Sequence, residues 1–312
     1  MAVPLTLIGG YLGAGKTTVI NGVLSSPHSG RTAVVVNDFG ELNIDAALIA
    51  ATGADTMELT NGCICCQITD DVQRTMSGLA ARADIDHVIC EVSGIGDPSQ
   101  LGTWRTFPGF RPGPIVICAD ALATPQRLND EFIADVVQQQ IASADLVFVT
   151  KADLATDDQI QATADACAQI DRTAEIEILT KSYLASVSDR LLRWSVDNDR
   201  LDRSEEGALL GSGPAHSEIH RTVTVPLPGE ADVQAVGTAL EQFAGRLSRA
   251  KGFVRDANDR WKHIHLASGT VSSGSLPARS AAPSQPEIVL IAAGANAKHI
   301  LAAAEERLRD LP

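Results

Sequence analysis

The chain is poor in positive charge for its length. Among its 312 residues, 25 Lys and Arg stand against 39 Asp and Glu, which gives a formal net charge of −14. Non-specific binding to nucleic acid requires clustered Lys and Arg that displace the counterions of phosphate groups. The charge balance therefore argues against that class of function, although it leaves room for a small phosphate-bearing ligand that backbone N–H groups could hold.

Long apolar runs and a disulfide pattern are also missing. No run of about 18 apolar residues occurs, so we expect no transmembrane helix and no membrane partner. The first ten residues lack the basic segment of a secretory signal. Three of the six cysteines fall within four residues, a poor layout for a disulfide framework. Cys90, Cys118 and Cys167 are predicted to be buried core residues. A cytoplasmic protein fits these features best.

The first two-thirds of the chain alternates strands with helices. A hydrophobic fraction of 45% is enough for a globular core. Predicted buried strands are Leu5–Ile8, Ala33–Asn37, His87–Glu91, Ile115–Ala119, Leu146–Thr150 and Ile176–Leu179. Helical spacing is found in Thr17–Leu24, Asp70–Ala83 and Glu131–Ser143. Because the strands are continuously apolar, this pattern predicts a doubly wound, mostly parallel α/β domain.

The pattern lapses over residues 197–216, which are densely charged and then rich in Gly and Ser, as linkers are. We therefore expect a first domain over residues 1–196 and a smaller α+β domain over residues 217–312. Predicted strands of the latter are Ile219–Leu227, Gly252–Arg255, Trp261–Leu266 and Glu287–Ala292, and its predicted helices are Ala231–Phe243 and Ala297–Leu308. Ser268–Gln285, rich in Ser, Gly, Pro and Ala, is predicted to be a long loop.

The strongest motif is a complete G-x-x-x-x-G-K-[ST] sequence between a predicted strand and a predicted helix. Its glycines let successive backbone N–H groups point at a phosphate, and the helix N-terminus favours negative charge. Lys16 would reach the β- and γ-phosphates and the Thr17 hydroxyl would bind Mg²⁺. The predicted phosphate-binding residues are Gly10, Gly13, Ala14, Gly15, Lys16, Thr17 and Thr18.

Two further strand ends carry polar residues. Glu91 ends one predicted strand, where its carboxylate could hold the Mg²⁺ shell, and Gly94 could bring its N–H close to a γ-phosphate. Thr150-Lys151-Ala152-Asp153 ends another and resembles the N-K-x-D guanine signature, with Thr in place of Asn. A carboxylate at Asp153 can accept from N1–H and the 2-amino group of guanine, whereas adenine would leave it unpaired. GTP is therefore favoured over ATP; the alternative is an ordinary surface turn.

The third motif is the cysteine turn Asn61-Gly-Cys-Ile-Cys-Cys66. Thiolates of Cys63, Cys65 and Cys66 are soft ligands suited to Zn²⁺ or Co²⁺. Three ligands leave a tetrahedral site one short, as a transient metal site requires. A redox-active Cys65/Cys66 pair, or cysteines without a function, are the alternatives.

A fourth polar segment, Asn37-Asp-Phe-Gly-Glu41, follows the second predicted strand at the same sheet edge. Asp38 is a candidate catalytic carboxylate there, because this position can sense a γ-phosphate. A polar loop with a glycine turn is the alternative interpretation.

Together these segments resemble the CobW-type branch of the P-loop GTPases, relatives of the nickel-insertion GTPases of urease and hydrogenase maturation. The matching segments are Gly9–Thr18, Val36–Glu41 with Ile44-Asp45, Asn61–Cys66, Glu91–Gly94 with Asp97-Pro98, Thr150–Asp153 and Arg246–Phe253. The Asn-Gly-Cys-x-Cys-Cys element is highly specific to this branch. Departures are Asp38 where the family usually has Glu, Thr150 for Asn, and a missing histidine-rich stretch. The pairs His216/His220 and His263/His265 are poor substitutes for it.

The resemblance implies a GTP-hydrolysing metallochaperone that holds zinc or cobalt and delivers it to a client metalloprotein under nucleotide control. Its cofactors would be GTP, Mg²⁺ and Zn²⁺ or Co²⁺. Slow turnover is expected unless a partner or a homodimer completes the catalytic site. The alternatives are a P-loop kinase for a small metabolite, a thiol redox sensor, or an activator of one metalloenzyme such as a nitrile hydratase or a cobalamin-pathway chelatase.

Overall fold

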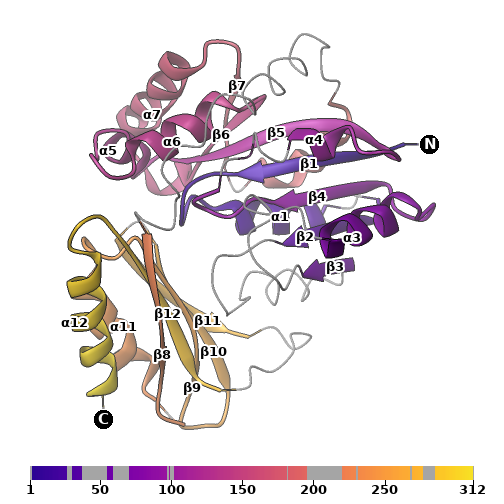
Figure 1. The fold of residues 1–312 in the computed structure, drawn as a ribbon. Coiled ribbons are helices and arrows are strands. Elements are labelled where there is room, and N and C mark those ends of the chain that lie inside the picture. Colours follow the sequence, from indigo (N-terminus) through magenta and orange to yellow (C-terminus); the bar gives the residue numbers. More distant parts are fainter. Residues whose placement is uncertain are drawn as a thin grey trace. The chain divides into compact units, whose positions relative to one another are not determined.

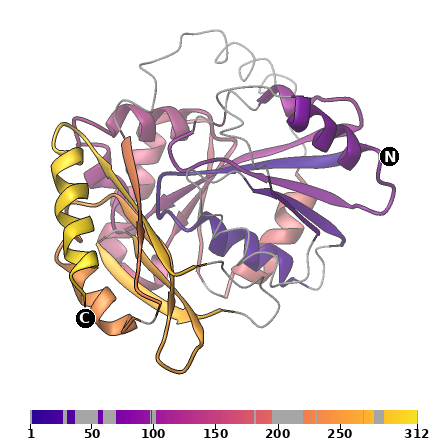
Figure 2. The same ribbon diagram turned by 60° about the horizontal axis from the view of Figure 1, so that its bottom comes forward.

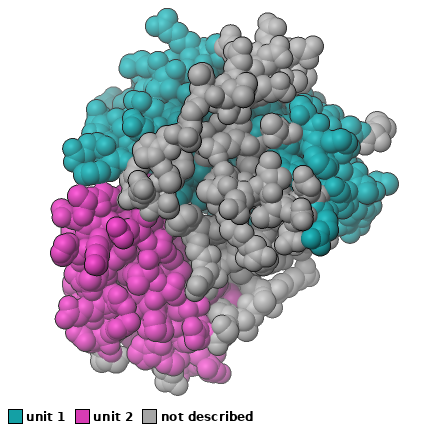
Figure 3. All heavy atoms as spheres, in the orientation of Figure 1, with its two compact units in different colours: residues 1–39, 52–212 teal, residues 40–51, 213–312 magenta. Residues whose placement is uncertain are grey.

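The structure is a computed structural model of the chain. It describes residues 2–26, 30–36, 55–58, 70–96, 98, 102–180, 182–194, 220–229, 231–267, 269–276 and 285–311. The chain divides into two compact units, residues 1–39 with 52–212 and residues 40–51 with 213–312 (Figure 3). The predicted linker, residues 197–216, lies outside the described residues, so the domain boundaries given above stay predictions.

The first unit is built on a seven-stranded sheet in which every described pairing is parallel. The strands are β1 (Val3–Gly9), β2 (Thr32–Val36), β3 (Asp55–Glu58), β4 (His87–Glu91), β5 (Phe110–Asp120), β6 (Leu146–Thr150) and β7 (Glu175–Ile178). Their order is β3-β2-β4-β1-β5-β6-β7, so β1 lies between β4 and β5 (Figure 1). The carboxyl ends of the parallel strands therefore meet at one edge, where open α/β sheets bind their ligands.

Continuous apolar runs explain why this sheet forms. Every residue of β1, β2, β4 and β6 is buried, so both faces of the central sheet are covered. The described helices of this unit are α1 (Lys16–Leu24), α3 (Asp70–Ala80), α4 (Gly102–Arg105), α5 (Thr124–Arg127), α6 (Ala134–Ala142), α7 (Asp157–Ile170) and α8 (Val187–Leu192), with short 3₁₀ helices η2 (Ala152–Leu154) and η3 (Leu184–Ser186). Helix α7 begins with a capping box of Thr156 and Gln159. The predicted α/β fold is confirmed.

In its described residues, the second unit is a five-stranded antiparallel sheet with two helices. Its strands are β8 (His220–Pro226), β9 (Arg249–Arg255), β10 (Trp261–Ala267), β11 (Thr270–Ser275) and β12 (Glu287–Ala293), in the order β11-β10-β9-β12-β8. Helices α11 (Val233–Glu241) and α12 (Ala297–Arg309) contact each other and lie against one face of this sheet (Figure 2). Buried residues of both helices and four of the strands form one apolar core. The predicted smaller α+β domain is confirmed as an architecture.

Two strands were not predicted. The expected long loop at Ser268–Gln285 is wrong for Thr270–Ser275, which is strand β11. This segment has a weak intrinsic preference for strand. It is a strand because it pairs with β10, from Lys262 opposite Ser275 to Ala267 opposite Thr270. Strand β3 was also missed, because it is only four residues long. All four of them pair with β2. None of the helices that the described residues form is long and apolar enough to cross a membrane.

Candidate functional site

The loop between β1 and α1 has the backbone that its glycines predict. Gly10, Gly13 and Gly15 have φ angles of 129°, 77° and 91°, in the region that favours glycine. Gly10 has a second constraint, because a Cβ there would lie 2.5 Å from the backbone oxygen of Cys118. Gly15 is the N-cap of α1, so the positive end of this helix opens onto the loop.

Lys16 and Thr17 begin helix α1. The Lys16 side chain is only 3% exposed, and its Nζ donates to the backbone oxygen of Gly10 at 2.9 Å. The ammonium group is thus held across the loop that the backbone N–H groups line. Thr17 is half-buried and Thr18 is exposed in the first turn of the helix. Backbone donors, a helix N-terminus and an ammonium group together form an environment suited to a phosphate chain.

The end of β4 packs directly on this loop. Glu91 lies opposite Ile8 of β1 and is 3% exposed. Gly94 follows three residues later, and a Cβ there would lie 2.6 Å from Leu12 Cδ2 and 3.0 Å from Leu12 N. Only a residue without a side chain allows this approach, so the Glu91–Gly94 turn and the phosphate loop are in close contact.

Gln140, on α6, supports that turn. Its side-chain amide donates to the backbone oxygens of Gly96 at 2.8 Å and Gly94 at 3.3 Å, and the residue is 1% exposed. Nothing in the sequence around Gln140 indicated this role, because the contact spans more than forty residues.

Arg127, on α5, is a second residue that sequence reasoning missed. Its guanidinium donates to the backbone oxygen of Leu12 at 3.0 Å and lies over the Tyr11 ring, 4.9 Å from the centroid. Burial lowers the pKa of Arg127 from its usual value, while the Asp120 carboxylate acts in the opposite direction. The group remains a cation and holds the Tyr11–Leu12 part of the phosphate loop.

The end of β6 is joined to the phosphate loop by the hydroxyl of Thr150. Thr150 is buried and its Oγ1 donates to the backbone oxygen of Ala14 at 2.7 Å. Lys151 has a φ of 58°, and its Nζ pairs with Oδ2 of the buried Asp120 at 2.7 Å. Asp153 is exposed and lies in the 3₁₀ helix η2. Thr150 stands where the N-K-x-D signature has Asn. Its side chain donates a hydrogen bond that links the end of β6 to the phosphate loop.

The remaining predicted residues divide into two groups. Cys90, Cys118 and Cys167 are buried, and burial raises the pKa of each thiol to about 12. These thiols stay protonated and serve as small core residues, as predicted. Asp38, the segment Asn37–Glu41 and the cysteine turn with Cys63, Cys65 and Cys66 lie outside the described residues. Within the described part of the chain, no group of three His, Cys, Asp or Glu side chains could hold a metal ion.

The strand–loop–helix geometry and the closely packed acidic strand end define a P-loop nucleotide-binding domain. Residues 4–177, more than half of the chain, match the nucleotide-binding domain of the CobW/HypB/UreG family. The chain therefore belongs to that family.

Curated relatives are similar to this chain over about half of its length. The chain is 32% identical over 193 residues to "Zinc chaperone CobW" of Sinorhizobium sp, covering 52% of this chain and 54% of the relative. It is 35% identical over 160 residues to "Zinc chaperone YeiR" of Escherichia coli, covering 50% and 48%. The chain thus spans about half the length of the curated relatives it matches. A crystal structure of Zn(II)-bound YjiA GTPase from E. coli aligns over 99% of this chain and 100% of that one, at 18% identity and a TM-score of 0.43.

Proposed function

We propose that the protein is a GTP-hydrolysing metallochaperone. In this proposal it binds one divalent transition metal, zinc or cobalt, through Cys63, Cys65 and Cys66 and transfers it to a client protein under nucleotide control. The observation that carries the nucleotide half is the hydrogen bond from Thr150 Oγ1 to the backbone oxygen of Ala14, 2.7 Å long. It joins the loop that would read the base to the loop that would hold the phosphates.

The chain's own groups can supply most of the catalysis that phosphoryl transfer requires, which is positioning and charge neutralisation. Lys16 is already buried beside the loop and would move its ammonium group from the Gly10 oxygen to the β- and γ-phosphates. Gly94, packed against Leu12, would donate its N–H to the γ-phosphate. Asp38 is proposed as a second carboxylate acting near the γ-phosphate.

Mg²⁺ fits the donors at this edge of the sheet. It takes oxygen ligands, and the Thr17 hydroxyl and the buried Glu91 carboxylate both flank the phosphate loop. When bound, Mg²⁺ would neutralise charge on the phosphate oxygens. It would also separate the negative charge of Glu91 from the negative charge of the phosphates.

The metal half of the proposal rests on the thiolates and the family. The "Zinc chaperone" names of the relatives support zinc as cargo. The cysteine turn lies in sequence between the Asn37–Glu41 segment and the Glu91–Gly94 turn. If both segments respond to a γ-phosphate, the affinity of the thiolates for metal must depend on which nucleotide is bound.

The test is a competition titration of the full chain with a chromophoric Zn²⁺ chelator, in a non-hydrolysable GTP analogue and in GDP. We expect one Zn²⁺ per chain and affinities that differ by roughly 5- to 150-fold between the two nucleotides. Cys65→Ser should abolish the site, whereas Cys167→Ala, in a buried position on α7, is the matched control. Equal metal affinity in both nucleotides would contradict the proposed switch, and unchanged binding by Cys65→Ser would contradict the proposed ligands.

A further inference from the structure

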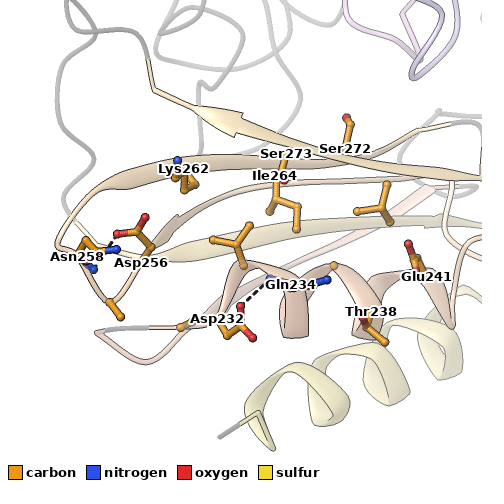
Figure 4. A pocket seen from close by; sticks show the side chains of 15 residues that line it. Asp232, Gln234, Thr238, Glu241, Asp256, Asn258, Lys262, Ile264, Ser272 and Ser273 are labelled. Atoms are coloured by element: carbon orange, nitrogen blue, oxygen red, sulfur yellow. Dashed lines mark hydrogen bonds between the residues drawn. The ribbon is translucent and has the colours of Figure 1, made fainter.

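A groove of about 980 Å³ lies in the second unit, between helix α11 and strands β10 and β11 (Figure 4). Its floor is apolar, with Ile264 buried and Val233 and Val271 half-buried. Gly237 lies in the middle of α11, and a Cβ there would be 3.6 Å from Val271 Cγ1 and 3.9 Å from Ile264 Cδ1. Because residue 237 has no side chain, the space between the helix and the strand stays open, although glycine weakens a helix interior.

One wall of the groove is the edge of a sheet. Within the described ranges, β11 has a strand neighbour on one side only, β10. One row of its backbone N–H and C=O groups therefore points away from β10. Its side chains are short (Thr-Val-Ser-Ser-Gly-Ser), so none of them would block another strand. An exposed edge beside a helix is a geometry in which proteins accept an extended peptide by strand addition.

More negative than positive side chains line the groove. Its lining holds three carboxylates, those of Asp232, Glu241 and Asp256, against the single ammonium group of Lys262. Asp256 is paired with Arg260 at 3.2 Å, and Lys262 Nζ donates to Ser275 Oγ at 2.7 Å. Glu241 lies at the end of the groove opposite Lys262 and Asp256 (Figure 4). That end therefore favours a positive charge in whatever the groove binds.

We infer that this groove binds an extended, basic peptide segment of a partner protein, which adds to β11 as a sixth strand. Backbone hydrogen bonds to β11 give the affinity. Apolar side chains on one face of the peptide contact Val233 and Val271 over Gly237, and a Lys or Arg meets Glu241. The inference uses only the second unit and does not depend on the proposed nucleotide chemistry.

The first experiment titrates two synthetic peptides into the full chain by calorimetry. The probes are acetyl-Lys-Thr-Val-Thr-Val-Thr-Lys-amide, in which Lys and Val share one face of the extended chain, and the same sequence with Glu in place of Lys. We expect the Lys peptide to bind with a Kd of roughly 10–100 µM and the Glu peptide at least about tenfold more weakly. Hydrogen exchange should slow at backbone amides of β11 when the Lys peptide binds, as strand addition requires.

Variants locate the binding. Gly237→Leu places a side chain into the floor and should weaken the Lys peptide at least about tenfold, whereas Gly237→Ala, whose Cβ makes ordinary contacts, should leave most of the affinity. Glu241→Lys should weaken the Lys peptide by about fivefold and strengthen the Glu peptide. Glu306→Lys, on the exposed face of α12, is the matched control and should change neither.

Three outcomes would overturn the inference: no binding of the Lys peptide, equal binding by Gly237→Leu, or unchanged exchange rates in β11. If Gly237→Leu does not fold, Glu241→Lys against Glu306→Lys decides, and equal affinities of those two variants overturn it. GTP hydrolysis should be the same in Gly237→Ala, Glu241→Lys and Glu306→Lys, so failure here is distinguishable from failure of the nucleotide site.

Discussion

The phosphate side and the base side of the candidate site differ in how much of each is held before a ligand arrives. On the phosphate side, Lys16 and Glu91 are both 3% exposed, and Gln140 and Arg127 hold the adjoining backbone. On the base side, Thr150 is buried but Asp153 is exposed, and neighbouring Leu154 is 69% exposed. If the proposed function holds, the phosphates would meet side chains that are already in place, whereas the base would bury Asp153 only as it binds.

The largest effect should come from the preorganised side. Lys16→Ala removes the cation that would stabilise charge on the transferring phosphate, so we expect GTP hydrolysis to fall at least about 100-fold. The fold should survive, since the Lys16 ammonium group lies at the phosphate loop and the core of this unit is built from apolar side chains. Single-turnover hydrolysis and thermal unfolding measure the two effects. Lys298→Ala, exposed on α12, is the control, and a Lys16→Ala protein that hydrolyses GTP normally would show that this loop is not the active site.

A change on the base side should have a smaller effect on GTP binding and should alter the preference among bases. Asp153→Asn replaces the carboxylate that would accept from N1–H and the 2-amino group of guanine. We expect GTP to bind about tenfold more weakly, the lower end for a charge-assisted hydrogen bond, because Asp153 begins in solvent. Xanthine nucleotide should gain affinity, since its 2-oxygen can accept from the new amide. Binding assays with GTP, XTP and ATP test this, with Asp158→Asn as control. Equal GTP and ATP affinity in the unmodified protein would refute it.

The smallest effect should come from the link between the two sides. Thr150→Val keeps the shape of the side chain but removes the donor to Ala14, a net loss of roughly 0.5–1.5 kcal/mol. We expect about fivefold weaker GTP binding, with the preference for GTP over ATP also reduced. Thr150→Ser keeps the hydroxyl and should behave like the unmodified protein. If Thr150→Val and Thr150→Ser bind GTP equally, the two loops do not depend on this bond.

The elements that were predicted well are those whose signal is local and strong. His87–Glu91 and Leu146–Thr150 have the predicted bounds, because a run of buried apolar residues between polar turns has few other structures available. Strand β11 was missed for the opposite reason. Its Ser and Gly residues predict a loop, and it is a strand only because β10 offers a partner along its whole length. Edge strands gain little from their own side chains.

The sequence by itself determined the phosphate loop, since its glycines permit backbone conformations that other residues avoid and its lysine follows directly. It also determined the parallel sheet, through the burial of whole strands. Only the tertiary structure decided which side chains support the site. Arg127 and Leu12 are 115 residues apart, and Thr150 and Ala14 are 136 apart. A hydrogen bond between such distant residues leaves no periodicity or spacing in the sequence, because it depends on how the strands are ordered in the sheet. The same holds for the groove, which needs a glycine on α11 and an edge strand that are distant in sequence.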